Sequence, residues 1–333
     1  MTTPSTTSTK TTRARSRIIA LEEHYWDAEM ATHFPAAEGR SPKLRERLFD
    51  LGELRLREMD DAGIDFQVLS QGAPATHRLA PDIAVPLAIR ANDRLQQAVK
   101  AHPSRFAAFA TLPAPDPKAS ADELERTVTQ FGFKGAMVHG FTLIGEQRVY
   151  IDDKRFWPIF ERAQALDVPI YLHPAAPHPA VIEAYYKDYA ADFPQLLSAG
   201  WGFTMEAATQ AIRLVLSGVF EAYPKLKIIL GHLGESLPFS LWRINEALSR
   251  AGNRGIPFRD IFCEHFHITT SGNFSNPALL CSVMEMGADR ILFSVDYPFV
   301  ENPPGVRWMD QVPLCAEDRE KILHGNAARL LKL

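Results

Sequence analysis

The chain has 333 residues, of which 46% are hydrophobic, and a formal net charge of -4. This is enough apolar material for a full core, and the near-neutral charge lacks the basic field that would attract nucleic acid or an anionic membrane surface. No apolar run approaches the ~20 residues of a membrane span. We therefore expect a soluble globular protein with neither nucleic acid nor a membrane among its partners.

Cysteine is sparse, with three residues and no CxxC pair. A disulfide framework or a thiolate zinc site is therefore not expected, and a reducing cytoplasm is the predicted location. Residues 1–16 are rich in Ser and Thr, carry basic residues and contain no acidic residue. Such a start can indicate a transit peptide, but no amphipathic apolar face accompanies the charges. We predict a disordered tail over 1–16 and a single domain over 17–333.

Short apolar runs recur along the chain, with amphipathic helical patterns such as 156–166 and 205–223 between them. The runs predict strands at 17–21, 65–69, 106–112, 135–138, 168–172, 226–230, 266–270 and 290–295. Alternation of apolar strands with helices is typical of an α/β protein with a parallel sheet, and eight strands close a (β/α)8 TIM barrel. The alternative is a doubly wound sheet, which predicts a glycine-rich phosphate turn that the sequence lacks.

Polar residues that can bind a metal follow most of the predicted strands. They are Glu22 and His24 after the first strand, His139 after the fourth, His173 after the fifth, His232 after the sixth and Asp296 after the eighth. Two predicted insertions, 27–52 and 174–203, also follow strand ends. In a barrel these ends converge on one mouth, where loops build the active site. A single histidine at a strand end is more often a core or rim residue, but this coincidence favours a site.

Glu22 and His24 are two residues apart on an extended segment, so both side chains should face the same side. Glu23 should then face away, as a surface or helix-packing residue. His173 and Asp296 complete a mixed N/O ligand set, which suits one Zn²⁺ or Mn²⁺ ion. The sequence therefore predicts a mononuclear metal site.

His232 lies three residues before Glu235, which can hydrogen-bond its imidazole, fix the tautomer and raise its basicity. The alternative is a helix-capping Glu235 with an unrelated His232. His178 and Arg243 either reach the mouth or are solvated. The remaining histidines are assigned to the core (His265, His267) or to the periphery (His33, His77, His102, His324).

These residues resemble the metal-dependent amidohydrolase superfamily, and more narrowly its decarboxylases of ortho-hydroxylated aromatic acids. The resemblance spans roughly Ile18 to Leu333. It is carried by Ala-Leu-Glu-Glu-His at 20–24, Tyr-Leu-His-Pro at 171–174, Leu-Gly-His-Leu-Gly-Glu at 230–235 and Phe-Ser-Val-Asp-Tyr-Pro-Phe at 293–299. It implies the same four metal ligands, a second layer formed by His232 and Glu235, and substrate contacts from Arg243 and Arg55. Several relatives have Asn where this chain has His139, so we expect this residue to touch a ring substituent.

The implied function is non-oxidative decarboxylation of an ortho-hydroxylated aromatic acid without an organic cofactor. Asp296 would protonate the ring carbon, assisted by His232, and Phe203, Trp201 and Phe299 would either wall the pocket or belong to the core. Because the family generally associates, a homodimer or homotetramer is expected.

Two other functions remain open. The same ligands suit a mononuclear hydrolase of a lactone or amide, with Asp296 as base. A barrel that binds a metal or ligand without catalysis would be expected to lack a ligand or His232, and all are present.

Overall fold

The computed structural model describes residues 16–34 and 40–333. The predicted tail, residues 1–16, lies outside the described residues except for Ser16. The strands of the described part are β1 (Ile19–Tyr25), β2 (Phe66–Gln71), β3 (Phe106–Ala108), β4 (Ala110–Thr111), β5 (Ala136–His139), β6 (Thr142–Ile144), β7 (Gln147–Val149), β8 (Ile170–His173), β9 (Ile228–Leu230), β10 (Phe266–Thr269) and β11 (Ile291–Leu292). Each of the eight predicted runs overlaps an observed strand, and the run at 106–112 contains two.

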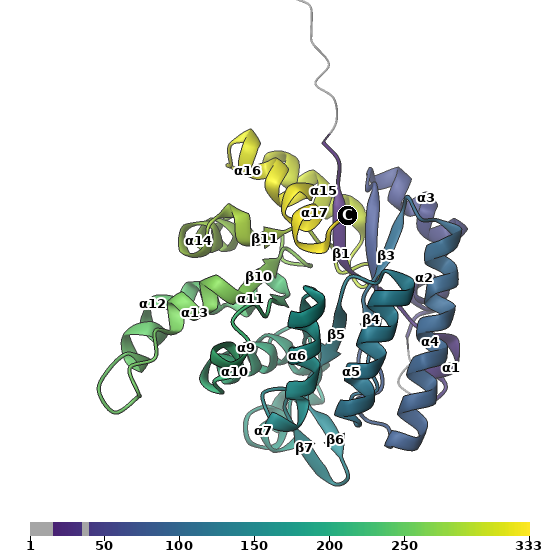
Figure 1. Ribbon diagram of the computed structural model, residues 1–333. Coiled ribbons are helices and arrows are strands. Elements are labelled where there is room, and N and C mark those ends of the chain that lie inside the picture. The colour runs from purple at the N-terminus through teal and green to yellow at the C-terminus, as the bar shows by residue number, and fades with distance from the viewer. Residues whose placement is uncertain (1–15, 35–39) are drawn as a thin grey trace, which may run out of the picture.

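Helices surround these strands (Figure 1). They are α1 (Ala28–Ala31), α2 (Pro42–Phe49), α3 (Glu53–Ala62), α4 (Pro81–Ala101), α5 (Pro117–Arg126), α6 (Trp157–Leu166), α7 (Pro179–Val181), α8 (Lys187–Ala190), α9 (Gly202–Leu216), α10 (Val219–Ala222), α11 (His232–Glu235), α12 (Leu237–Leu248), α13 (Phe258–His265), α14 (Asn276–Met286), α15 (Asn302–Gln311), α16 (Ala316–Glu320) and α17 (Asn326–Leu331). No helix among the described residues is both long and apolar enough to cross a membrane.

The strands form two parallel sheets and one separate hairpin. The sheet orders are β1-β2-β3 and β11-β10-β9-β8-β5-β4, and β6 pairs antiparallel with β7. The two larger sheets meet at both ends. Only Phe109 separates β3 from β4, and Leu21 of β1 pairs with Ser294, just beyond β11. The predicted α/β class with parallel strands is confirmed at this level.

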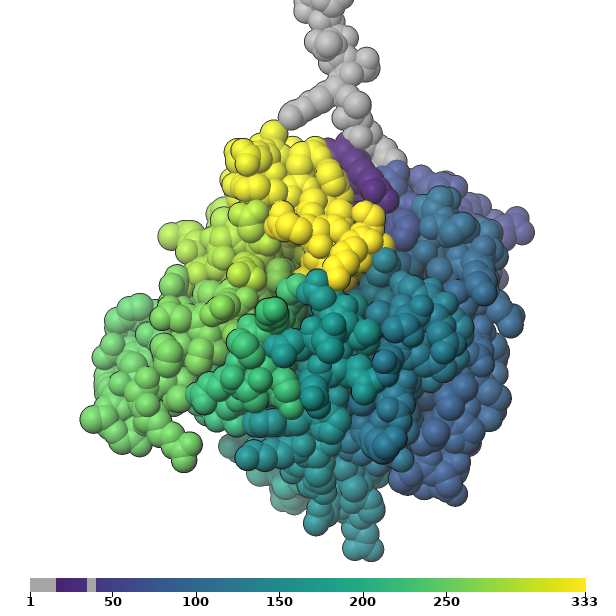
Figure 2. Space-filling model, viewed as in Figure 1, coloured from purple at the N-terminus to yellow at the C-terminus, as the bar shows by residue number. Residues whose placement is uncertain are grey.

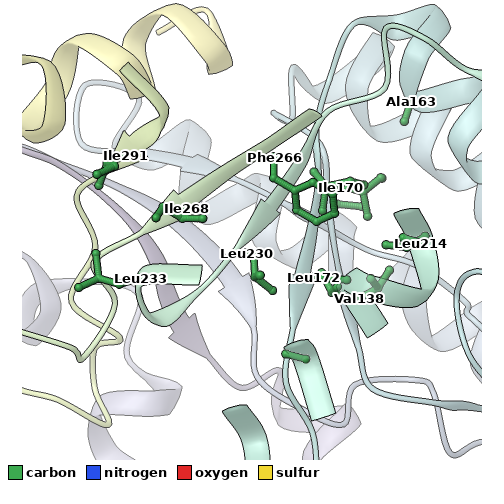
Figure 3. Close-up of a cluster of buried hydrophobic side chains, with 14 of the residues drawn as sticks. Val138, Ala163, Ile170, Leu172, Leu214, Leu230, Leu233, Phe266, Ile268 and Ile291 are labelled. Atoms are coloured by element: carbon green, nitrogen blue, oxygen red, sulfur yellow. The ribbon is translucent and has the colours of Figure 1, made fainter. Parts of the chain in front are cut away.

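Alternate residues of the strands pack into two different layers. Val138 and Leu172 belong to a large cluster with Leu214 of α9, between the strands and the helices (Figure 3). Met137 and Tyr171, the intervening residues on the same strands, belong to a second cluster. Because both faces of the strands are buried, their sequences are nearly continuous apolar runs.

We call the second cluster the inner cluster. Its buried members are Ile19, Leu21, Phe66, Val68, Ala107, Phe109, Met137, Tyr171, Ile229, Leu292, Ala327, Leu330 and Leu331. They come from both larger sheets and from α17, which lies beside β1 in Figure 1. Because one cluster contains residues from both sheets, the two sheets curve around a common hydrophobic core. Strand residues that continue this alternation therefore point towards a common centre.

Candidate metal centre

A change of register in β1 directs two predicted ligands towards the centre of the molecule. Leu21 belongs to the inner cluster, so strict alternation would place Glu23 next on that side. Between Ala20 and Glu23, however, the pairing with β2 shifts as in a β-bulge, and Glu22 adopts φ 60°. The bulge reverses the alternation, and Glu22 and His24 face the centre instead.

The four predicted metal ligands come together. One ligand atom from each of Glu22, His24, His173 and Asp296 lies within 4.8 Å of the other three. His24 Nε2 is 3.4 Å from Asp296 Oδ1, and His173 Nε2 is 3.4 Å from Glu22 Oε1. Among the described residues, Glu22 Oε1, His24 Nε2 and Asp296 Oδ1 are buried without a hydrogen-bond partner. Because unpaired buried polar atoms are unfavourable, these convergent atoms fit a divalent cation.

Two residues that sequence reasoning missed hold the other oxygen of Glu22. The Tyr171 hydroxyl donates to Glu22 Oε2 and lies 2.9 Å from Thr269 Oγ1, which is itself 3.3 Å from Glu22 Oε2. A Cβ atom at Gly231 would come within 3.0 Å of the same oxygen, so glycine leaves room for the carboxylate. Tyr171 precedes His173 by two residues on β8, and this same-face spacing was the available signal.

Glu23 was predicted to face away from the site as a surface or helix-packing residue, and its position at the surface is contradicted. The side chain is fully buried. Its carboxylate accepts the backbone N–H groups of Val295, at 3.0 Å, and Tyr297, at 3.2 Å, which flank Asp296. Burial raises the pKa of Glu23 to about 8, against the lowering influence of the Val295 N–H and Arg55. Glu23 thus ties β1 to the segment that carries Asp296.

His232 and Glu235 are joined as expected, with 2.6 Å between Nδ1 and Oε1. Five consecutive residues over 232–236 have positive φ, so α11 is a tight left-handed turn rather than a regular helix. This turn directs His232 Nε2 towards Glu22 Oε1, at 3.7 Å, and Asp296 Oδ2, at 3.9 Å. Burial lowers the pKa of His232, but the carboxylates of Glu235 and Glu22 outweigh it and raise the pKa well above its usual value.

Burial also shifts the pKa values of the ligand group itself. It raises the pKa of Glu22, against the influence of His232. It lowers the pKa of His173 well below the usual value, and His24 adds to this effect. For Asp296, burial is outweighed by the nearby imidazoles of His232 and His24, and the net pKa is lowered. A neutral His173 and an ionised Asp296 are the forms that bind a metal cation.

His139, predicted to touch a ring substituent, lies beside the ligand His173. Its side chain is almost fully buried, and its Nδ1 is 3.1 Å from His173 Nδ1. His77, predicted to be peripheral, is also buried, and its Nε2 accepts the backbone N–H of His139 at 3.0 Å. By contrast, His265 and His267 are buried away from the ligand group, as predicted.

Arg55, for which the resemblance implied a contact with the substrate, is bonded to other parts of the chain. Arg55 is fully buried, and its guanidinium donates to the backbone carbonyls of Asp50, at 3.0 Å, and His24, at 2.5 Å. It also donates to Gln67 Oε1 at 3.2 Å and lies over the ring of Tyr297. Its donors are occupied by the protein, so Arg55 supports β1 from behind.

The other predicted substrate residues are exposed or half-buried. Phe299 is 39% exposed, and its ring centroid is 5.7 Å from that of His24, so it borders the open side of the ligand group. Trp201 is 46% exposed, and Phe203 is half-buried. Arg243 is exposed on α12 and does not belong to the buried group. His178 caps α7 by accepting the backbone N–H of Ala180.

The known proteins that this chain resembles include three that match it over nearly its whole length. A γ-resorcylate decarboxylase from Polaromonas sp. strain JS666 is 43% identical over 327 residues, which cover 95% of this chain and 98% of the relative. The crystal structure of a dihydroxybenzoic acid decarboxylase from the same strain, with bound manganese and the inhibitor 2-nitroresorcinol, is 42% identical. It has a TM-score of 0.88 and covers 96% of this chain and 98% of that chain. The crystal structure of a 2,6-dihydroxybenzoate decarboxylase in complex with 2,6-dihydroxybenzoate has a TM-score of 0.88 and 40% identity, over 96% of this chain and 100% of that chain.

The family assignment rests on a match over most of the chain. The sequence pattern of the amidohydrolase family matches residues 24–333, which include three of the four clustered ligands. The match also contains His232, Glu235 and the last strand. The chain therefore belongs to the amidohydrolase family.

Proposed function

We propose that this protein is a metal-dependent, non-oxidative decarboxylase of an ortho-hydroxylated aromatic carboxylic acid. The observation that carries the proposal is the convergence of Glu22, His24, His173 and Asp296, with three unpartnered buried atoms aimed at one point. The full-length relatives named above are decarboxylases of dihydroxybenzoates, which favours this reaction over hydrolysis of a lactone or amide.

The architecture that we propose is a (β/α)8 barrel with insertions at the ends of its strands. Its support is the shared inner cluster, together with the two seams at Phe109 and at the Leu21–Ser294 pair. The Leu21 N–H donates to the Phe293 carbonyl at 3.2 Å across the second seam. In this fold, strand ends from distant parts of the sequence surround one site.

We propose that one divalent ion is held by Glu22, His24, His173 and Asp296. Two imidazoles and two carboxylates suit Mn²⁺ or Zn²⁺, and manganese is bound in the related Polaromonas structure. When bound there, the ion supplies a Lewis acid that stabilises the anionic carboxylate and phenolate of the substrate.

The proton is delivered by Asp296 and His232. His232, which Glu235 holds through Nδ1, supplies the proton. Asp296 takes up this proton from His232 and then transfers it to the ring carbon that bears the carboxylate. The bond from this carbon to the carboxylate then breaks, its electron pair returns to the ring, and CO2 leaves. An ortho hydroxyl, once ionised, supplies the electron density that makes this carbon accept a proton.

Substrate contacts are proposed for Phe299, beside His24, and for Arg243, whose guanidinium matches a carboxylate. We also propose a homodimer or homotetramer. Phe239 and Trp242 on α12 are 85% and 70% exposed, and Met284 on the neighbouring α14 is 83% exposed. The region of α12 and α13 projects from the body of the molecule (Figure 2), and exposed aromatic residues on a projecting helix are typical of subunit contacts.

The test is CO2 release from hydroxybenzoates by Mn²⁺- and Zn²⁺-loaded protein. We expect turnover of 2,6-dihydroxybenzoate and none of para-hydroxybenzoate, which lacks the ortho oxygen. Asp296→Asn should reduce turnover by about 10²–10⁴-fold because it removes the proton donor. Asp310→Asn, at an exposed position on α15, is the matched control and should keep wild-type activity. Equal turnover of the two substrates, or lactone hydrolysis with no CO2 from any hydroxybenzoate, would overturn the proposal.

A further inference from the structure

We propose that His139 and His77 are positioning residues that fix the ring orientation and tautomer of the metal ligand His173. The inference rests on the proposed metal-dependent function, and it concerns two side chains outside the ligand group. Both are almost fully buried.

The tautomer of His173 follows from its backbone partner. His173 Nδ1 lies 2.6 Å from the carbonyl oxygen of Pro174, which can only accept a hydrogen bond. His173 therefore carries its proton on Nδ1, and Nε2 is free as a ligand atom. Nε2 is the nitrogen that faces Glu22 Oε1 at 3.4 Å. The ring is thus oriented through the nitrogen that does not face the site, as is usual for metal-binding histidines.

The tautomer of His139 follows in turn. His139 Nδ1 is 3.1 Å from the same protonated nitrogen of His173, so His139 Nδ1 must accept rather than donate. The proton of the His139 ring is left for Nε2, and the backbone carbonyl of Gln71 accepts from this ring. The two rings lie edge to face, with centroids 4.9 Å apart and an interplanar angle of 70°. His139 therefore supports the ring of His173 from the side opposite to the ligand atom.

His77 fixes His139 through the backbone. Its Nδ1 lies 3.1 Å from the carbonyl oxygen of Pro74, so Nδ1 carries the proton and Nε2 is an acceptor. Nε2 accepts the backbone N–H of His139 at 3.0 Å, at the last residue of β5. The partners of these three rings agree on one set of tautomers.

An asparagine at position 139 can supply a hydrogen-bond acceptor in place of His139 Nδ1. In both side chains the atom bonded to Cγ can accept a hydrogen bond, so the asparagine Oδ1 occupies the place of His139 Nδ1. Leucine puts a methyl group there and leaves the His173 N–H with Pro174 alone. The pair His139→Asn and His139→Leu therefore separates the hydrogen bond from the volume of the side chain.

The first experiment is titration of the metal-free protein with Mn²⁺, with free ion followed by electron paramagnetic resonance. Loss of an outer partner of a ligand histidine typically weakens metal affinity about 10–100-fold, and we expect this for His139→Leu. His139→Asn should stay within about threefold of wild type by the same reasoning. The matched control is His265→Leu, because His265 is also a buried histidine bonded to a backbone carbonyl, and it should bind as wild type. Wild-type affinity in His139→Leu, or equal weakening in both variants, would overturn the inference.

The second experiment needs no variant at position 139. Nitrogen-15 spectra of the histidine rings in Zn²⁺-loaded wild-type protein should give a proton on Nδ1 of His77 and His173 and on Nε2 of His139. A proton on Nδ1 of His139 would overturn the inference even if the leucine variant does not fold. Failure of the wild-type protein to bind a divalent ion would instead sink the proposed function, so the two failures are distinguishable.

Discussion

Replacement of Glu23 should test how strongly β1 is tied to the segment that carries Asp296. The Glu23 carboxylate accepts two buried backbone N–H groups, from Val295 and Tyr297. Each buried donor left without a partner costs about 1–3 kcal/mol, so Glu23→Ala should destabilise the protein by about 2–6 kcal/mol. This is a large part of the roughly 5–15 kcal/mol that holds a typical domain folded. Glu23→Gln keeps one carbonyl oxygen as an acceptor, so its loss of stability should be about half that of Glu23→Ala.

The measurement is urea unfolding followed by circular dichroism, with metal affinity of the folded variants as a second readout. Both variants should bind metal more weakly, because Asp296 stands between the two released N–H groups. Glu317→Ala is the control, since this side chain is 79% exposed, and it should change stability by less than about 0.5 kcal/mol. A loss of stability in Glu23→Ala that is no larger than in Glu317→Ala would refute the reasoning.

Three further predictions concern the metal, one buried acid and the subunit contact. Removal of the metal by a chelator should lower the melting temperature, and added Mn²⁺ should restore it, because a ligand at 100 times its Kd adds about 2.7 kcal/mol to the free energy of unfolding. An unchanged melting temperature in calorimetry would argue against a bound ion. Burial raises the pKa of Glu206 from 4.5 to about 7, so the folded protein holds a proton that the unfolded chain releases, and stability should fall as pH rises through this interval. Glu206→Gln should remove this pH dependence, and at pH 8 the variant should be more stable than wild type by up to about 3 kcal/mol. Parallel profiles of stability against pH for the variant and the wild type would contradict this prediction. Trp242→Asp should convert the proposed oligomer into a 37.2 kDa particle in light scattering, whereas a variant that keeps the wild-type mass would place the contact elsewhere.

The strands and the four ligands could be predicted from sequence because two simple rules coincide. Strands buried on both faces are continuous apolar runs, and polar residues at their carboxyl ends are then conspicuous. His173 and Asp296 were found in this way, as were Glu22 and His24. The prediction that Glu22 and His24 face the site was correct, but its reason was incomplete. Because Leu21 also faces inwards, a β-bulge is needed to turn Glu22 and His24 to that side, and no sequence pattern indicates this bulge.

The supporting residues could not be predicted because their roles depend on contacts between distant strands. Glu23 accepts N–H groups from the far end of the chain, and no local pattern encodes that pairing. Arg55 and His77 resemble ordinary helix and loop residues in sequence, yet both are buried against the ends of neighbouring strands. His139 was placed at the correct strand end, but which layer of the site it occupies depends on the ring beside it.

The position of the ligands along the chain has a consequence for biosynthesis. Glu22 and His24 leave the ribosome with the first strand, whereas Asp296 emerges only after every other strand has been made. The inner cluster likewise receives Leu330 and Leu331 from the last helix of the chain. Because nascent domains emerge from the N-terminus onwards, a growing chain holds at most part of the cation-binding group until translation is nearly complete. The complete group of four is therefore present only near the end of translation, and a chain that ended before Asp296 would lack one of its members.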